Sequence, residues 1–313
     1  MMKKRILAIS TIAMSLLMTI SCGSDDDGGG TPPIEMADFT VELVQVDELE
    51  GDFIYEGWII VDGTPISTGT FDASEDDYTF TTLASDLAAA TNFVVSIEPV
   101  PDTDPAPAAT KILSGAFDGD RANLTLDEIA DFATIDGNFE IFAPSESDNM
   151  NQENGLWFVT TVIDDMTMEE SFEAGLNLPT LADGWRYEGW VVFEKDGAEV
   201  PVSTGTFTEV TGLDDAISFN GSNILNVPPF PGEDFLDGEF ESIDGMTTLM
   251  FPEDGNIIGN EVFISVEPDP DTNEAVPFFV QPLDGNAINI GNNVTNLLSR
   301  NNGGLIAQGT VRR

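Results

Sequence analysis

The feature that most constrains the fold of this chain is an internal duplication. Residues 55–71 read YEGWIIVDGTPISTGTF, and residues 187–207 read YEGWVVFEKDGAEVPVSTGTF. A second matching pair follows, because FVVSIEP at residues 93–99 resembles VFISVEP at residues 262–268. Self-similarity of this kind indicates two copies of one structural unit. Any fold or function assigned to the chain must therefore fit a duplicated module.

The pattern of apolar and polar residues in the repeated segments favours β-strands. From Phe39 onward, short apolar runs are separated by Gly, Asp, Asn and Pro at intervals of about 8–12 residues, which is typical of all-β domains. Asp62 and Gly63 stand between two such runs and predict a tight hairpin. The second copy has four extra residues at this hairpin, and we expect them to lengthen the turn. We predict an all-β chain with two tandem β-sandwich-like (Ig-like) domains.

The N-terminus has the layout of a secretory signal. Residues 3–5 are basic, and residues 6–20 form a short apolar run. These features, with a small residue before the cleavage point, distinguish a signal peptide from a membrane span. Cys22 is the only cysteine of the chain and lies where a bacterial lipobox has its modified cysteine, which this segment resembles. We expect residues 1–21 to be a lipoprotein signal peptide and Cys22 to be lipidated.

An acidic tether follows the expected lipidation site. Residues 22–37 are rich in Gly, Asp and Pro, a composition typical of flexible spacers. Within the tether, the run begins with Ser24 and continues through Asp25, Asp26 and Asp27. This run resembles the export signal of Bacteroidota surface lipoproteins, although a merely solvated linker is the alternative. We expect a lipid-anchored outer-membrane protein that is displayed on the cell surface.

Net charge narrows the range of partners. Loss of three basic residues with the signal leaves seven Lys and Arg against 57 Asp and Glu, a formal charge of −50. Such a chain repels nucleic acid, so we expect no nucleic-acid partner. Self-repulsion of this size destabilises a folded state unless it is screened, which predicts a saline habitat or bound divalent cations.

Composition also suggests a domain boundary. We place domain 1 at residues 38–149 and domain 2 at residues 150–313, separated by a polar stretch rich in Asn, Ser and acidic residues. Domain 2 carries an insert at about residues 208–260, which contains a proline-rich run around Phe230. After removal of the signal, 292 residues remain, which is enough for two domains with separate cores.

The first repeat resembles a known family. It has a Tyr-x-x-Trp strand from Tyr55, a Gly-x-Phe strand that ends at Phe71, and an Ile-Glu-Pro strand at residues 97–99. This succession resembles the extracytoplasmic C-terminal domain of anti-sigma-K factors, and the second copy matches it at both ends but departs through its insert. The resemblance implies a β-sandwich-like domain without catalytic residues. It does not imply sigma-factor regulation, because we expect a cleaved signal and tether here, whereas that function needs a cytoplasmic sigma-binding domain and a membrane helix.

The residue inventory argues against an enzyme. There is no His, which removes His-dependent triads and imidazole metal ligands. The single Cys leaves no disulfide and no spare thiol. A pair of carboxylates could still support glycoside hydrolysis, because 57 acidic residues guarantee close pairs somewhere. We expect a non-enzyme, with a carboxylate-based hydrolase as a distant third reading.

One loop carries the only cofactor hypothesis, a structural Ca²⁺ ion. Asp269, Asp271 and Asn273 place oxygen-bearing side chains at alternate positions, as calcium loops do. The Gly and the final acid of an EF-hand loop are missing, so a solvated loop is the alternative. We expect no other cofactor.

The aromatic residues also have two readings. The Tyr and Trp of each YEGW motif could stack on sugars, but their place beside branched apolar residues favours burial. Trp157, Trp185 and Phe230 are the remaining candidates for ligand binding, and sugar binding requires them to be exposed together. We expect a non-catalytic surface lipoprotein that acts as an envelope binding or structural module, with an envelope protein or glycan as partner. A polysaccharide-binding accessory lipoprotein is the alternative.

Overall fold

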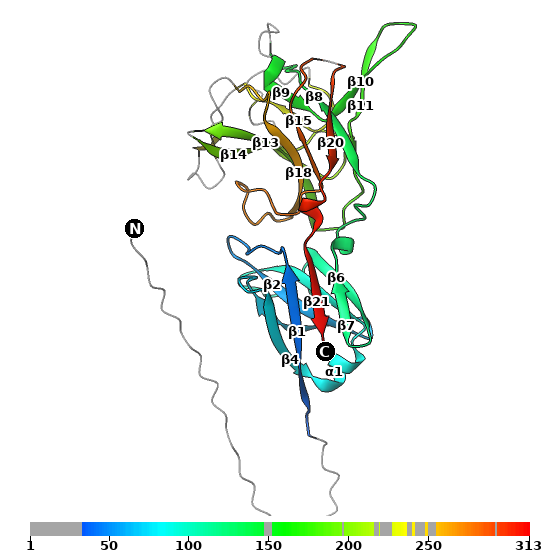
Figure 1. The fold of residues 1–313 in the computed structure, drawn as a ribbon, viewed down its shortest axis with the longest axis vertical. Coiled ribbons are helices and arrows are strands. Elements are labelled where there is room, and N and C mark those ends of the chain that lie inside the picture. The colour runs from blue at the N-terminus through cyan, green and yellow to red at the C-terminus, as the bar shows by residue number, and fades with distance from the viewer. Residues whose placement is uncertain are drawn as a thin grey trace, which may run out of the picture. The chain divides into compact units, whose positions relative to one another are not determined.

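A computed structural model describes residues 33–146, 152–195, 197–215, 219, 227–236, 240–241, 248–249, 255–291 and 293–313. Strands dominate these residues and helices are few and short, so the all-β prediction is confirmed. The strands form two large sheets, and both lie within the unit Glu35–Arg313 (Figure 1). The expected signal peptide and nearly all of the expected tether lie outside the described residues.

The first sheet has eight strands in the order β3-β2-β5-β6-β7-β21-β1-β4. All of its neighbouring pairs are antiparallel. A short helix, α1 (Ala84–Ala89), joins β4 to β5, and a 3₁₀ turn, η1 (Leu126–Glu128), follows β7. The strands of this sheet are β1 (Met36–Val44), β2 (Phe53–Val61), β3 (Thr64–Phe71), β4 (Asp77–Leu83), β5 (Asn92–Pro99), β6 (Lys111–Asp118), β7 (Arg121–Leu124) and β21 (Gln308–Arg312).

The second sheet has the order β14-β13-β18-β19-β20-β8-β9-β15, and β12 pairs with β8 beside this path. Two small hairpins, β10–β11 and β16–β17, stand apart from it, and two 3₁₀ turns, η2 (Gln152–Asn154) and η3 (Gly303–Leu305), complete the described elements. The remaining strands are β8 (Asp136–Glu140), β9 (Gly155–Trp157), β10 (Val159–Ile163), β11 (Glu170–Ala174), β12 (Leu176–Asn177), β13 (Trp185–Lys195), β14 (Ala198–Phe207), β15 (Gly232–Asp234), β16 (Phe240–Glu241), β17 (Thr248–Leu249), β18 (Glu261–Pro268), β19 (Leu283–Asn286) and β20 (Thr295–Arg300).

The division between the sheets does not coincide with the boundary predicted between residues 149 and 150. Strand β8 precedes that boundary but pairs with β20 in the second sheet, and β21 lies at the end of the sequence but pairs with β1 and β7 in the first. A polar stretch marks a loop, whereas sheet membership depends on long-range pairing that composition does not report. The predicted insert, residues 208–260, is described only in part, and its strand β15 pairs with β9.

The duplicated segments form closely similar hairpins. In the first, β2 and β3 are joined at Asp62 and Gly63, whose φ values of 49° and 77° suit the predicted two-residue turn. In the second, β13 and β14 pair as far as Lys195 and Ala198. The four extra residues therefore lengthen the strands by two residues each, and the expectation of a longer turn is wrong. Added length stays in register when both strands gain the same number of residues.

The glycine of each YEGW motif makes room for an aromatic ring. The register of each hairpin shifts directly after this glycine, at Gly57/Trp58 and at Gly189/Trp190. A Cβ atom on Gly57 would lie 2.8 Å from Phe93 Cζ, and one on Gly189 would lie 2.7 Å from Phe158 Cε2. Real Cβ contacts are longer than these distances, so the motif needs glycine in both copies.

The aromatic residues of the YEGW motifs belong to the core. Trp58 and Trp190 are buried, and each indole Nε1 donates a 2.8 Å hydrogen bond to a serine hydroxyl on the next strand. The hydroxyls of Tyr55 and Tyr187 each donate to a backbone carbonyl eight residues earlier in the chain. Burial satisfies the apolar bodies of these rings, and the hydrogen bonds satisfy their polar atoms. The preference for packing over sugar stacking is confirmed at these positions.

Candidate functional site

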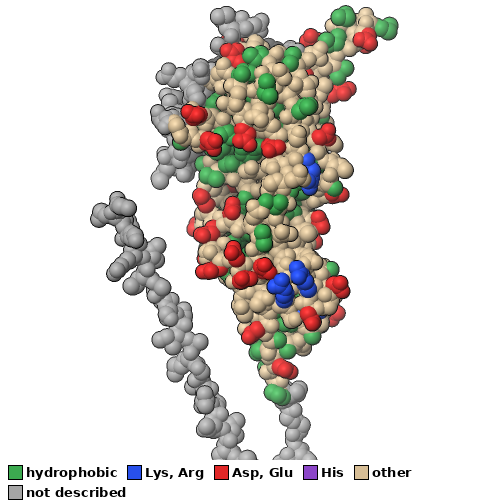
Figure 2. All heavy atoms as spheres, viewed as in Figure 1, with side chains coloured by type: hydrophobic (Ala, Val, Ile, Leu, Met, Phe, Trp, Pro, Cys, Tyr) green, Lys and Arg blue, Asp and Glu red, His purple; other side chains and the backbone are tan. Residues whose placement is uncertain are grey.

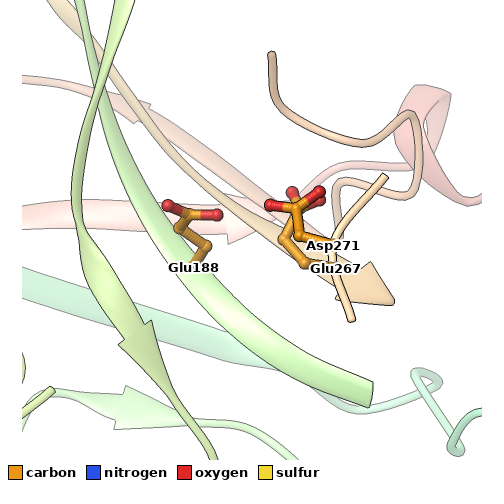
Figure 3. Close-up of side chains that lie close together, drawn as sticks. All are labelled: Glu188, Glu267 and Asp271. Atoms are coloured by element: carbon orange, nitrogen blue, oxygen red, sulfur yellow. The ribbon is translucent and has the colours of Figure 1, made fainter. Parts of the chain in front are cut away.

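Three acidic side chains meet at one end of the second sheet (Figure 3). Glu188 lies on β13 and Glu267 on β18, while Asp271 lies in the loop after β18. Glu188 pairs with Ser265, two residues from Glu267, so both glutamates occupy the same face of neighbouring strands. One carboxylate oxygen from each of the three residues lies within 4.8 Å of the others. We call this group the carboxylate trio.

The two glutamates of the trio are almost completely buried. Only 4% of Glu188 and 2% of Glu267 is exposed, and Asp271 is half-buried. Ser203 Oγ donates to Glu188 Oε1, while Ser265 Oγ and, at 2.9 Å, the backbone N–H of Phe278 donate to Glu267 Oε1. The second oxygen, Oε2, of each glutamate has no hydrogen-bond partner among the described residues. Each buried glutamate thus accepts hydrogen bonds at Oε1, while its Oε2 has no partner among the described residues.

The environment of the trio opposes negative charge. Burial raises the pKa of Glu188 well above its usual range, and the charge of Glu267 adds to this effect. Burial likewise raises the pKa of Glu267 to about 8, with a smaller contribution from Asp271. The nearby Arg186 pairs instead with Asp215 at 3.2 Å and Asp269 at 2.8 Å. None of the ion pairs found in the described part of the chain includes a member of the trio. Within the described ranges, no side-chain cation pairs with the trio to offset its charge.

The first sheet contains a related but incomplete arrangement. Glu56 and Glu98 occupy the matching positions of β2 and β5, and they accept from Ser67 and Ser96 as their counterparts do. The backbone N–H of Ala108 donates to Glu98 Oε1 at 2.8 Å. Asp102, which matches Asp271, is exposed. Among the described residues, only the second-sheet trio gathers three acidic groups within ligand distance.

The predicted calcium loop contributes one member to the trio. Asp271 joins it, and Asp271 Oδ1 also accepts from the backbone N–H of Asn273 at 2.8 Å. Asp269 is engaged by Arg186, and Asn273 Oδ1 accepts from the N–H of Ala275 at 3.0 Å. Sequence spacing therefore found the loop but missed both glutamates. Their only sequence signal was their repetition in the two copies, since strand register alone brings them together.

The three candidate aromatic residues are buried. Trp157 is completely enclosed and donates from Nε1 to Asp234 Oδ1 at 2.8 Å. Trp185 lies against the ring of Phe278, with ring centroids 6.0 Å apart, and Phe230 packs in a small cluster with Trp157. These residues do not form the exposed platform that sugar binding requires. The hypothesis that they bind a sugar ligand is therefore wrong for this structure. Apolar rings beside a sheet gain more from burial than from exposure.

A polar hollow of about 500 Å³ lies on the second sheet, where Glu261 and Asp284 line it together with Asn286 and Asn296. Partial burial raises the pKa of Glu261, and the charge of Asp284 adds to the rise. A second hollow of about 380 Å³ is lined by Asp127 and Asp131, so each of these two hollows presents a pair of carboxylates. The distant hypothesis of a carboxylate-based hydrolase would have to use one of these two pairs.

Cys22 and the residues Ser24, Asp25, Asp26 and Asp27 lie outside the described residues. Within the described residues, no helix combines the length and apolar character that crossing a membrane requires. Lipidation and export therefore remain predictions from the sequence.

Comparison with known proteins finds a family match for one part of the chain. Residues 35–112 match the family model described as anti-sigma-K factor rskA, C-terminal. The match runs from the residue before β1 to the beginning of β6 and includes the YEGW motif of the first copy. No curated protein and no solved structure matches the chain significantly. The resemblance of the first repeat is thus confirmed, while that of the second copy stays a prediction.

Proposed function

We propose that this protein is a non-catalytic lipoprotein of the bacterial outer membrane, anchored through Cys22 and displayed on the cell surface. Its β-sheet region would serve as an envelope binding or structural module without a sigma-factor-binding domain. The observation that carries this proposal is the match of residues 35–112 to the anti-sigma-K factor C-terminal family model. The resemblance of the first repeat implies that this domain is extracytoplasmic. A lipidated cysteine and a short tether in front of such a domain would leave it outside the cytoplasm.

The burial of the aromatic residues supports a structural or protein-binding role over a sugar-binding one. All four tryptophans lie in the core, as do Phe230 and the paired tyrosines of the YEGW motifs. Carbohydrate modules generally present aromatic faces to solvent, because sugar rings stack on them. Among the exposed large apolar residues of the described part, none is aromatic. A polysaccharide-binding accessory role is therefore the weaker alternative.

Lipid labelling tests the anchor. Cells expressing the full chain or its Cys22→Ser variant would be fed an alkyne-tagged fatty acid, then fractionated. We expect label on the wild-type chain in the outer membrane and no label on the variant. An unlabelled wild-type chain would contradict the proposal.

A second variant separates anchoring from display. Replacement of Asp25, Asp26 and Asp27 by Asn keeps Cys22 but removes the acidic run. We expect this variant to be labelled and yet protected from protease added to intact cells, whereas the wild-type chain is digested. Equal digestion of both would show that the acidic run is only a linker.

Crosslinking on intact cells then distinguishes the partners. One protein recovered in a fixed ratio would support an interaction module, while recovery of the chain with glycan would favour the polysaccharide alternative. The wild-type chain and the acidic-run variant should differ in this capture, because only the former would reach the surface.

A further inference from the structure

The carboxylate trio has an unsatisfied interior. Both glutamates are more than nine-tenths buried, yet Glu188 Oε2 and Glu267 Oε2 have no hydrogen-bond partner among the described residues. Figure 3 shows one oxygen of the Glu188 carboxylate on the side that faces Glu267 and Asp271. A buried carboxylate oxygen without a partner costs more free energy than a neutral polar atom would. Two such oxygens in one cluster of carboxylates indicate that a further atom or ion binds between the side chains.

We propose that Glu188, Glu267 and Asp271 bind one hard divalent cation of the Ca²⁺ type. The two Oε2 atoms without hydrogen-bond partners would become ligands of the ion, and the ion would offset the negative charge of the trio. This inference is independent of membrane anchoring, because it rests on the second sheet and its loop alone.

The geometry suits such an ion. Calcium binds oxygen at about 2.3–2.6 Å, so two of its ligands can lie up to about 5 Å apart. The trio oxygens, all within 4.8 Å of one another, satisfy this limit. Three carboxylates supply at least three of the six to eight oxygens that Ca²⁺ takes, and water can supply others through the half-exposed Asp271 side.

The donors also select the class of metal. All three ligands are carboxylates, and the chain has no His and no Cys except Cys22. Zinc, copper and iron prefer sites that include nitrogen or sulfur, whereas carboxylate sites suit Ca²⁺, Mg²⁺ and Mn²⁺. Mg²⁺ demands near-ideal octahedral geometry and keeps most of its water. A largely buried site assembled from two strands and a loop therefore favours Ca²⁺.

The outer contacts of the trio resemble those that orient metal ligands. Ser203 holds Glu188 Oε1, while Ser265 and the Phe278 N–H hold Glu267 Oε1. Such bonds fix the orientation of the carboxylates and leave Oε2 of each glutamate free for a metal ion. The rival occupant is a proton shared between the glutamates, which would remove one of the pair's two negative charges but leave no role for Asp271.

The first sheet provides an internal control. It reproduces both glutamates and their serine donors at Glu56 and Glu98, but its third acid, Asp102, is exposed. The cation should therefore bind once per chain, in the second sheet only. Variants of Glu56 and Asp102 are matched controls for variants of Glu188 and Asp271.

The test uses the full chain, purified in detergent and freed of metal with a chelator. Calcium is titrated calorimetrically at about 0.5 M NaCl, where screening suppresses weak binding to the acidic surface. We expect one site per chain, at least tenfold weaker in Glu188→Gln and in Asp271→Asn and unchanged in Glu56→Gln and Asp102→Asn. Equal binding by all five proteins, or no binding by the wild type, would overturn the proposal.

A second readout guards against misfolding of the buried variant. Amide hydrogen exchange of residues 269–278, measured with and without Ca²⁺, should slow in the wild type because the ion holds Asp271. The half-buried Asp271→Asn variant, whose fold is checked by circular dichroism, should show no such slowing. Slowing of the same size in this variant would mean that the ion binds elsewhere and would contradict the assignment.

Discussion

At the level of single residues, each of the two sheets contains the same series of buried hydrogen bonds among apolar side chains. In each copy a Trp indole donates to a Ser hydroxyl, and that hydroxyl donates to a Glu carboxylate: Trp190, Ser265 and Glu267 in the second sheet. Trp58, Ser96 and Glu98 repeat it in the first. Buried polar groups of this kind are stabilising only while every member keeps its partner. The serine is the central member, because it serves both neighbours.

Removal of that serine should be costly in both copies. Ser265→Ala and Ser96→Ala each leave a buried indole N–H without an acceptor and a glutamate without one donor. We expect each variant to lose about 1–3 kcal/mol of unfolding free energy, measured by chemical denaturation. Ser74→Ala is a control at an exposed turn, where a loss below about 0.5 kcal/mol is expected. Equal stability of all three variants would contradict a structural role for the chain of contacts.

A buried glutamate on β15 should make stability depend on pH. Burial raises the pKa of Glu233 to about 9, and the charges of Asp214 and Asp234 add to the rise. An unfolded Glu ionises near about 4.3, so between that pH and about 9 the folded chain holds an extra proton. The contribution of Glu233 is therefore complete below this window and is lost as pH rises through it, by at most about 1.4 kcal/mol per pH unit.

The matched variant is Glu233→Gln, which keeps the side-chain size but cannot ionise. Denaturation at a series of pH values should give a shallower decline for the variant than for the wild type. Parallel curves would show that Glu233 does not carry the dependence.

At the scale of elements, strand order was the hardest feature to foresee. Alternating residues and the Asp62-Gly63 turn predicted the repeated hairpins, because these depend on neighbours in the sequence. The position of β21 between β1 and β7 depends on residues far apart in the chain, and its short sequence carries no signal for its partners. The carboxylate trio was hidden for the same reason: β13 and β18 bring Glu188 and Glu267 together only through their register.

Strand β21 completes the first sheet, so its loss should be severe. Val311 is fully buried there, and Arg313 donates to the carbonyls of Ala90 and Gly119 and covers the ring of Phe117. Deletion of residues 308–313 would expose the edges of β1 and β7, and exposed edges promote association between chains. We expect a loss of more than about 3 kcal/mol and aggregation on gel filtration.

The control for this deletion is Arg312→Ala. Its side chain pairs with Glu42 at 3.2 Å on an exposed surface, so the cost should stay below about 1 kcal/mol. A deletion no more harmful than this substitution would mean that β21 is dispensable.

At the scale of the whole molecule, charge dominates. Figure 2 shows Asp and Glu side chains spread over the visible face, with few Lys and Arg among them. The formal charge of −50 expected after signal removal produces repulsion throughout the folded state. This property could be predicted from the sequence, since it depends on composition and not on strand pairing.

Screening should therefore stabilise the protein. We expect the melting temperature to rise steadily as NaCl increases from about 0.05 M to about 1 M, where the screening length falls to about 3 Å. KCl should act equally, because screening depends on ionic strength. A melting temperature independent of salt would contradict this account of the acidic surface.

A crystallographic experiment can show directly whether the second sheet contains a cation site that the first sheet lacks. The most direct measurement is an anomalous difference map from crystals of the chain soaked in Tb³⁺, a Ca²⁺ substitute that binds oxygen ligands and scatters anomalously. We expect a peak among the carboxylates of Glu188, Glu267 and Asp271 and none between Glu56 and Glu98. An empty trio, or peaks confined to surface acids, would contradict this expectation.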